Sequence, residues 1–501
     1  MPHPRSVVPA QRIRQLNQSA IRHDGEWVLY WMTAHRRSTS NFALQRAVEW
    51  ANELAKPLFV FEPLRLTYPW ASDRLHRFIL DGIADNRDAF RRPGVTYFPY
   101  VETPGHPDGL IDLLASKSAA VVCDDFPAFI VNRITEAAAA RVNVLTEAVD
   151  ANGILPMRRP EQEFSTALSF RRYLQRTLLE SFPIRPAAAP LAALRQTAGA
   201  AVPAEVSRVW LSRTDELISG AQGLDTLPID HRVATLKARG GSRAAHAALR
   251  RFLKTGLSRY ADEHNAAESD VTSRLSPYLH FGHIGSWEIF DALMKGESWL
   301  GVLPARATGA RQGWWGVSPG AEAFLDQLIT WRELGFNTCV RRPEDYDRFE
   351  SLPAWARATL LRHVTDRRSI TYSLEQFEGA ATDDSLWNAA QGQLIAEGRI
   401  HNYLRMLWGK KILEWTPSPH DALAVMIELN NKYAADGRDP NSYSGIFWTL
   451  GRYDRPWPPE RPIFGTVRYM SSKNTARKMP VKEYVRRYAP DRHRERPIPD
   501  Y

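Results

Sequence analysis

The chain has 501 residues, too many for one compact hydrophobic core, so two or three domains are expected. Hydrophobic residues make up 44% and charged residues 24%, and no apolar run approaches the roughly 20 residues that span a bilayer. No apolar stretch follows the basic N-terminus either, so we expect a cytoplasmic protein, neither membrane-bound nor secreted. The net charge of +9 and the pI of about 9.5 favour a polyanionic partner.

The first part of the chain alternates short apolar runs with segments of helical spacing. The runs are Glu26–Met32, Pro57–Phe61, Val95–Tyr100 and Ala119–Asp124, and the helical segments include Asn41–Leu54 and Arg74–Phe90. This alternation predicts a Rossmann-like α/β domain with a parallel sheet, which we place at residues 1–183. No GxGxxG follows the first run, so the standard dinucleotide fingerprint is absent.

The segment after this domain is rich in proline and alanine, and we predict a linker at residues 184–226. From residue 227 to 501 the pattern predicts an all-α domain, with helical segments around 243–260, 285–295, 321–337, 387–415 and 418–433. Its basic C-terminal tail fits a solvated charged segment as well as a DNA-contacting one. The tail holds Lys473, Arg477, Lys478, Lys482, Arg486, Arg487, Arg492, Arg494 and Arg496.

The chain contains sixteen tryptophans, most of them after residue 280. Trp408 and Trp415 are seven residues apart, two helical turns, so both project from one face, and Trp387 lies on the turn or helix just before. Indole is easily oxidised, and a file of indoles can pass an electron from the surface to a buried redox cofactor. Plain core packing is the alternative interpretation of such spacing.

Other kinds of site find little support. Cys123 and Cys339 lie far apart in the sequence, which gives neither a disulfide framework nor a cysteine zinc site. His280, His283 and His401 have no carboxylate cluster at ligand spacing, so we predict no metal site. No Ser-His-Asp arrangement or Gly-Lys-Ser/Thr loop occurs in a convincing context.

Hydroxyl residues cluster before a proline at residues 272–282, a place where a helix begins. Backbone amides and the helix dipole at such a start favour a phosphate, although an ordinary N-cap gives the same pattern. The sequence Thr-Ser-x-Leu-Ser-Pro-Tyr-Leu-x-x-Gly here resembles the flavin diphosphate-binding signature of the photolyase and cryptochrome family. Tyr260 falls where that family places a phosphate-contacting tyrosine.

Further segments in the same order are similar to class II cyclobutane pyrimidine dimer (deoxyribodipyrimidine) photolyases. They are residues 386–391, 404–415, 429–441, 454–457 and 461–470, whereas the resemblance over residues 27–160 is looser. The resemblance implies FAD in the helical domain. It leaves open whether the N-terminal domain holds an antenna pigment, a deazaflavin or a folate.

The resemblance also assigns roles to single residues around the flavin. It puts Trp408 nearest the flavin, Trp387 in the middle and Trp415 toward the surface, as an electron-transfer chain. It places Asn430 near flavin N5 and Asp436, Arg438 and Asp439 around the isoalloxazine rim and ribityl chain. Without it, Asp-Gly-Arg-Asp-Pro is simply a charged turn. The complete cofactor set that it implies is Tyr260, Thr272, Ser273, Arg274, Leu275, Ser276, Arg332, Asn402, Arg405, Asn430, Asp436, Arg438 and Asp439.

For the lesion, the resemblance implies that Trp331 and Trp448 stack against a flipped pyrimidine dimer, with Asn402 and Met406 lining the pocket. Gln327 stands where repair enzymes hold a glutamate, one turn before Trp331. Glutamine can donate a hydrogen bond to a dimer carbonyl but cannot act as an acid. Asp326 points about 100° away around the helix and is a poor substitute.

These observations predict a monomeric flavoprotein that repairs cyclobutane pyrimidine dimers by light-driven electron transfer from reduced FAD. Its partner is damaged DNA and no membrane, so it should associate with the nucleoid when bound. The main alternative, supported by Gln327, is a cryptochrome-like photoreceptor that keeps FAD and the tryptophans but repairs poorly. A third hypothesis, a flavin oxidoreductase without light chemistry, leaves the tryptophan arrangement unexplained.

Overall fold

The computed structural model describes residues 6–182, 184–195, 198–210, 213–220, 222–304 and 306–490. The chain divides into two compact units, each assembled from several stretches of sequence. Unit 1 comprises Met1–Pro160, Thr177–Arg250 and Arg274–Ser298, and unit 2 comprises Glu161–Arg176, Arg251–Ser273 and Trp299–Tyr501.

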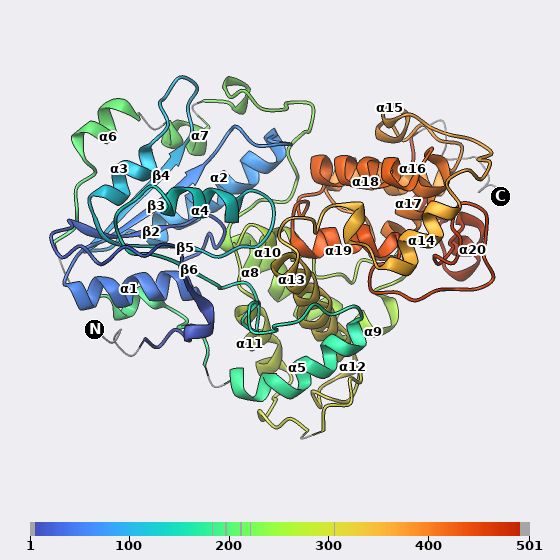
Figure 1. Ribbon diagram of the computed structural model, residues 1–501, viewed down its shortest axis with the longest axis horizontal. Helices are drawn as coiled ribbons and strands as arrows, with labels where there is room; N and C mark the ends of the chain where they lie inside the picture. The colour runs from blue at the N-terminus through green and yellow to red at the C-terminus, as the bar shows by residue number, and fades with distance from the viewer. Residues whose placement is uncertain are drawn as a thin grey trace. The chain divides into compact units, whose positions relative to one another are not determined.

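Unit 1 is built on a six-stranded sheet with the strand order β1-β6-β5-β2-β3-β4. All neighbouring strands are parallel except β1, which pairs antiparallel with β6. Figure 1 shows helices surrounding this sheet. The strands and the helices between them are β1 (Ile13–Gln15), β2 (Trp27–Trp31), α1 (Phe42–Leu54), β3 (Leu58–Leu64), α2 (Asp73–Ala89), β4 (Val95–Val101), α3 (Leu110–Ser116), β5 (Ser118–Asp124), α4 (Val131–Ala139) and β6 (Thr146–Val149).

The central strands explain why the apolar runs of the sequence form a parallel sheet. Every residue of β2 and of β5 is buried, as expected for strands with both faces covered by other elements. Helix α1 packs on the sheet, and the Asn41 side chain caps it by accepting hydrogen bonds from the amides of Ala43 and Leu44. The α/β prediction for this part of the chain is confirmed.

Two strands were not predicted from the sequence, and the predicted linker contains short helices that were not expected. The four predicted strands correspond to β2, β3, β4 and β5, but β1 and β6 are short and lack a long apolar run. Short helices occupy part of residues 184–226, namely η2 (Pro190–Ala193), α6 (Ala204–Val209), α7 (Thr214–Ser219) and η3 (Leu224–Thr226). Residues 183, 196, 197, 211, 212 and 221 of this region lie outside the described residues.

Unit 2 is helical, in agreement with the sequence prediction for the C-terminal part. Its main helices are α9 (Leu257–Glu263), α12 (Pro319–Leu325), α13 (Arg332–Arg341), α14 (Ala354–Arg362), α15 (Leu374–Glu378), α16 (Ser385–Glu397), α17 (Asn402–Trp415), α18 (Pro419–Tyr433), α19 (Pro440–Thr449), α20 (Ser472–Lys478) and α21 (Lys482–Tyr488). Elsewhere the chain forms α5 (Ala167–Ser181), α8 (Ser242–Arg251), α10 (Ser276–His280) and α11 (Ser286–Gly296).

Three predicted helical segments are interrupted in ways that the hydrophobic pattern does not reveal. The segment 387–415 is two helices, because α16 ends at Gly398, whose φ of 66° is left-handed. The segments 243–260 and 321–337 each contain a π-helical stretch, at Phe252–Gly256 and at Asp326–Trp331. Such π turns are frequent at functional sites.

The basic C-terminal segment is folded at least as far as residue 490. Helix α21 packs on α16, and the buried Tyr484 hydroxyl donates a hydrogen bond to Gln393 Oε1 at 2.8 Å. Most of the basic side chains of α20 and α21 remain exposed on this anchored pair of helices. Arg492, Arg494 and Arg496 lie outside the described residues.

Within the described ranges, no helix combines the length and the apolar character needed to cross a bilayer. Cys123 and Cys339 are buried free thiols, and burial raises the pKa of each.

Candidate functional site

The three tryptophans singled out in the sequence form a continuous chain of ring contacts inside unit 2. The Trp387 and Trp408 rings lie parallel, with centroids 6.5 Å apart and an interplanar angle of 3°. On its other side, Trp387 meets Trp415 edge to face at 5.9 Å. Helix α17 carries Trp408 and Trp415 on one face, and α16 supplies Trp387 between them. The order of contact is therefore Trp408, Trp387, Trp415.

Hydrogen bonds fix the orientation of the two parallel indoles. Trp387 Nε1 donates to the backbone oxygen of Trp408 at 3.0 Å. Trp408 Nε1 donates to Gln391 Oε1 at 2.9 Å, and Gln391 lies one turn after Trp387 on α16. Since both polar atoms are satisfied, the rings are held in one geometry rather than packed as interchangeable apolar bulk.

Trp415 is more buried than expected for the outer member of the chain. It is only 2% exposed, and its ring contacts the half-buried Tyr372 ring at 5.3 Å. The ammonium of Lys411 lies 5.0 Å from the Trp415 ring centroid and pairs with Glu414 at 2.9 Å. The route from Trp415 to solvent thus passes other side chains.

The fit of the implied FAD can be tested on the carboxylate of Asp436. This side chain is largely buried, and among the described residues its Oδ1 atom has no hydrogen-bond partner. Its ion pair with Arg405 of α17 is long, at 3.8 Å. A buried carboxylate oxygen without a donor is costly unless a ligand supplies one. The polar rim of a flavin, with its ring N–H, fits this requirement.

The charged turn after α18 is shaped by close backbone packing. Arg438 is buried with a left-handed φ of 69°, and its backbone amide donates to Asn431 Oδ1 at 3.0 Å. A Cβ on Gly437 would approach the Asn430 backbone oxygen to 2.9 Å, so only glycine fits there. Asp439 caps α19 by accepting the Asn441 amide at 2.9 Å. The turn interpretation of Asp-Gly-Arg-Asp-Pro is therefore correct, whether or not a flavin also binds it.

Asn430 lies in the same buried polar group. Its Nδ2 atom donates to Ser442 Oγ at 2.9 Å and to Asn431 Oδ1 at 3.2 Å. These bonds hold the amide group in place inside unit 2. The predicted position of Asn430 beside flavin N5 stays a prediction.

The segment predicted to bind the flavin diphosphate is not an ordinary N-cap. Helix α10 begins after Leu275, which offers no side-chain cap, and Arg274 has a left-handed φ of 57°. The Thr272 hydroxyl accepts a hydrogen bond from Arg399 Nη1 at 3.5 Å. Thr272 and Ser273 belong to unit 2, whereas Arg274, Leu275 and Ser276 belong to unit 1. Tyr260, on α9 of unit 2, is buried against Phe252 and Phe324.

Gln327 and Trp331 both lie in the π-helical stretch Asp326–Trp331, and both side chains are half-buried. The neighbouring Asp326 is unavailable, because its two carboxylate oxygens pair with Arg171 at 2.8 and 3.1 Å. This pairing is a second reason, besides the direction of its side chain, to regard Asp326 as a poor substitute for a glutamate at position 327.

The remaining residues predicted for the lesion pocket lie on two helices that pack together, α17 and α19. Trp448 of α19 and Met406 of α17 are half-buried, while Asn402 at the start of α17 is exposed. Arg332, which belongs to the predicted cofactor set, is the first residue of α13 and is buried, 4.6 Å from the Phe336 ring centroid. The lesion pocket formed by Gln327, Trp331, Asn402, Met406 and Trp448 stays a prediction.

In unit 1, the carboxyl ends of β2 and β5 form the switch point where a doubly wound sheet normally binds a ligand. Here Asp124 Oδ2 accepts the backbone amides of Thr33, Ala34 and His35 at 2.7 to 2.8 Å. The amides that could hold a ligand phosphate are thus already bound by the protein.

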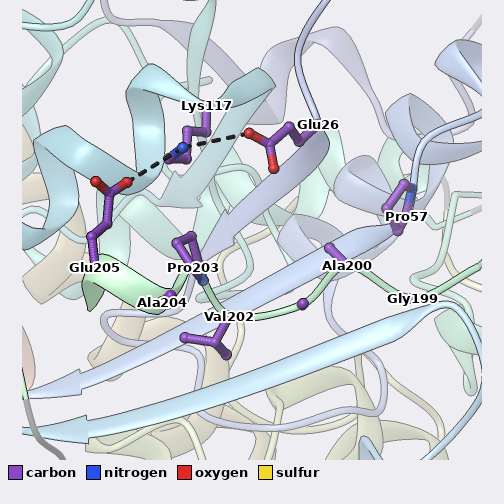
Figure 2. A pocket seen from close by; sticks show the side chains of 10 residues that line it. Glu26, Pro57, Lys117, Gly199, Ala200, Val202, Pro203, Ala204 and Glu205 are labelled. Carbon is purple, nitrogen blue, oxygen red and sulfur yellow. Dashed lines mark ion pairs between the residues drawn. The ribbon is translucent and has the colours of Figure 1, made fainter. Parts of the chain in front are cut away.

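A shallow pocket of about 710 Å³ lies at the opposite, amino-terminal ends of the strands of unit 1. Figure 2 shows Lys117 there between Glu26 and Glu205, with ion-pair distances of 3.5 and 3.3 Å. None of the predicted site residues lines this pocket. Among the described residues, no group of three or more His, Cys, Asp or Glu side chains could hold a metal ion.

Three polar residues that contact the predicted site were not predicted from the sequence. Gln391 orients Trp408, and Lys410 and Lys411 are buried beside Trp448 and Trp415. Burial lowers the pKa of Lys410 to about 7. The only sequence signal was a pair of lysines inside an otherwise apolar helix, and lysines are expected at the surface.

The chain is similar to several known photolyases along nearly its whole length. It is 34% identical over 487 residues to a deoxyribodipyrimidine photo-lyase of Methanothermobacter thermautotrophicus, covering 96% of this chain and 98% of that protein. It is 32% identical to the Arabidopsis thaliana protein of the same name, covering 91% of this chain and 88% of that protein, and 29% identical to that of Potorous tridactylus, covering 96% and 85%. No family model matches the chain.

A solved structure supports the fold. The crystal structure of a bacterial class III photolyase from Agrobacterium tumefaciens aligns with a TM-score of 0.66 at 17% identity, covering 93% of this chain and 86% of that chain. The combination of a parallel sheet and a helical unit is therefore an arrangement already known in photolyases. Together with the identity to the archaeal protein over almost its whole length, it shows that the chain belongs to the deoxyribodipyrimidine photo-lyase family.

Proposed function

We propose that the protein repairs cyclobutane pyrimidine dimers in DNA as a class II photolyase. When bound, photoexcited reduced FAD supplies the electron that opens the cyclobutane ring and receives it back after repair. The residues of the protein hold the cofactor, stack the flipped dimer and exclude water. In this proposal Trp331 and Trp448 provide the stacking surfaces.

One observation carries the proposal: helix α17 carries both Arg405, which faces Asp436, and Trp408, the first ring of the tryptophan chain. Arg405 faces Asp436, whose carboxylate oxygen needs a donor, and Trp408 follows three residues later on the same helix. From Trp408 the ring contacts continue to Trp387 and Trp415. A ligand held by Arg405 and Asp436 would therefore lie next to the inner end of an oxidisable chain.

The basic surplus supplies nonspecific affinity for the DNA backbone in this proposal. The chain carries a net charge of +9, and basic side chains of α20 and α21 are exposed. Phosphate contacts release counterions, so binding to undamaged DNA should weaken steeply with added salt.

The proposal is tested by illuminating the reduced, FAD-loaded protein with single-stranded DNA that contains thymine dimers. Recovery of thymine absorbance in the light, and none in the dark, supports repair. Intact photoreduction of the flavin without any recovery of thymine absorbance would exclude repair.

That second result would favour a cryptochrome-like photoreceptor, for which Gln327 is the specific observation. The glutamine amide at this position can form hydrogen bonds but has no proton to give as an acid. Such a protein would keep FAD and the tryptophan chain while repairing poorly.

Replacing Gln327 with glutamate should raise the quantum yield of dimer repair by about two- to fivefold. In its protonated form a glutamic acid can donate an O–H hydrogen bond to a dimer carbonyl and can give up that proton as an acid, which the amide cannot. A gain of roughly 0.5 to 1 kcal/mol in the light-driven step gives this factor. The measurement is repair per absorbed photon, with flavin photoreduction as the control. An unchanged or lower yield would mean that the amide at position 327 does not limit repair.

We further propose functional domains at residues 1–183 and 227–501, joined by 184–226, with any antenna pigment in the first. The absorption spectrum of the purified protein would distinguish a deazaflavin from a folate. Sedimentation would test the expected monomer.

A further inference from the structure

Lys410 is a fully buried lysine beneath the tryptophan of helix α19. Its side chain has 0% exposure, and its ammonium donates a hydrogen bond to the backbone oxygen of Thr449 at 2.5 Å. The same ammonium lies 5.5 Å from the Trp448 ring centroid. Among the described residues, no carboxylate lies within ion-pair distance of Lys410.

Two other lysines of unit 2 also lie over aromatic rings, but each has a carboxylate partner. Lys411 pairs with Glu414 at 2.9 Å, and Lys432 pairs with Glu378 at 2.5 Å. A buried ammonium without a counter-ion costs stability, and an apolar side chain of the same length would avoid the cost. The hydrogen bond to Thr449 offsets part of this cost at Lys410, and among the described residues no counter-ion offsets the rest.

The backbone is arranged so that this lysine reaches the end of α19. A Cβ on Gly409 would approach Thr449 Cγ2 to 2.7 Å, so glycine lets α17 and α19 come close. Thr449 is the last residue of α19, where the helix dipole favours a cation. The ammonium thus holds both the carboxyl end of α19 and the indole of the preceding residue, Trp448.

Trp448 receives a second cation at its ring. The Arg468 guanidinium lies between two indoles, 5.4 Å from the Trp448 ring centroid and 4.0 Å from that of Trp457, and pairs with Asp454 at 3.3 Å. The indole is only half-buried, so part of it remains open to a base. An indole clamped by cation–π contacts has little freedom to rotate away from a stacking partner.

We propose that Lys410 is a positioning residue for the pyrimidine dimer, whose buried ammonium fixes the Trp448 indole in the orientation that stacks on the lesion. This inference rests on the proposed function, which gives Trp448 its stacking role. The lysine acts through Trp448 and does not touch the dimer.

The charge of Lys410 makes this role dependent on pH. Burial lowers its pKa to about 7, nearby Asp454 opposes the decrease and Arg468 reinforces it. The ammonium is present below about pH 7 and is lost as pH rises, so the preference for dimer-containing DNA should fall between about pH 6 and pH 8. Because the lowered pKa disfavours the proton in the folded state, Lys410 reduces stability most at low pH.

The test uses the FAD-loaded Lys410→Met protein, a dimer-containing oligonucleotide and the same oligonucleotide undamaged. The ratio of the two dissociation constants cancels nonspecific phosphate binding. At low pH we expect the preference of the variant for dimer-containing over undamaged DNA to be about fivefold smaller than that of the wild type. The reason is that misorienting one stacked base costs on the order of 1 kcal/mol. Its ratio should no longer change with pH, and its Tm should be unchanged or higher.

Two further variants complete the test. Lys410→Arg keeps a permanent charge and should keep the preference for the dimer without the decrease above about pH 7. Lys432→Met removes a lysine over Tyr433 and should leave the ratio and its pH dependence as in the wild type.

Three results are informative against the inference. A Lys410→Met protein with the wild-type ratio at every pH would overturn the role of Lys410. The role would also be overturned if the variant lost its preference for the dimer together with a lowered Tm, because that combination indicates a structural role. A wild-type protein that shows no preference for the dimer would overturn the proposed function itself.

Discussion

Replacing Trp408 with phenylalanine is expected to slow the light-driven reduction of bound FAD by more than about tenfold, a factor that an added barrier of only about 1.4 kcal/mol already gives. Trp408 is the inner member of the contact chain, parallel to Trp387 at 6.5 Å. A phenyl ring is much harder to oxidise than an indole, and it cannot donate the hydrogen bond that Gln391 accepts. The measurement is the rate of flavin photoreduction with an external electron donor.

The control for this prediction is repair by enzyme reduced chemically before illumination. In the proposed function the three tryptophans serve only to reduce the flavin, so the chemically reduced Trp408→Phe variant should repair dimers as the wild type does. Trp314→Phe is a matched variant, because Trp314 is a buried tryptophan of unit 2 that packs edge to face on Trp315. Photoreduction at the wild-type rate in the Trp408 variant would exclude Trp408 as the obligatory donor.

The parallel sheet could be predicted because its central strands are buried on both sides. The run Ala119–Cys123 in β5 is apolar at every position, and its short length favours a buried strand over a helix. Strand β1 could not be found in this way, since Ile13–Gln15 contains two polar residues. It forms because it pairs antiparallel with β6 at the sheet edge, a contact between segments more than a hundred residues apart.

The candidate site was predictable to a similar extent. Helical spacing gives the common face of Trp408 and Trp415, but the parallel stacking of Trp387 depends on how α16 packs against α17. The π-helical stretch at Gln327 has no sequence signal, because it changes the hydrogen-bonding register and not the residue types. Buried lysines such as Lys410 contradict the usual surface position of lysine, so pattern analysis assigns them to solvent.

Replacing Asp436 with asparagine is expected to weaken FAD binding by about 10- to 100-fold, since a hydrogen bond to a charged group contributes roughly 1.5 to 3 kcal/mol. The carboxylate Oδ1 is buried and has no hydrogen-bond partner among the residues that the structure describes. If it accepts a hydrogen bond from the flavin, that bond loses its charge in the variant. The measurement is the dissociation constant of FAD by fluorescence titration.

The same substitution should have the opposite effect on the protein without FAD. In that state the wild-type carboxylate is largely buried, and among the described residues it has only the long 3.8 Å contact to Arg405 in return. A neutral amide of the same shape should therefore leave Tm unchanged or raise it. Asp384→Asn is the matched control. Asp384 is a fully buried carboxylate that caps α16 through the amides of Leu386 and Trp387.

Because the hydrogen bonds of Asp384 all lie within the protein, Asp384→Asn should lower Tm with or without FAD and leave FAD affinity nearly unchanged. A carboxylate with a structural role should show this lower Tm and normal FAD affinity, whereas a carboxylate that binds the ligand should not. If Asp436→Asn lowered the Tm of the FAD-free protein and bound FAD normally, Asp436 would belong to the first kind. The cofactor rim would then have to be sought elsewhere in unit 2.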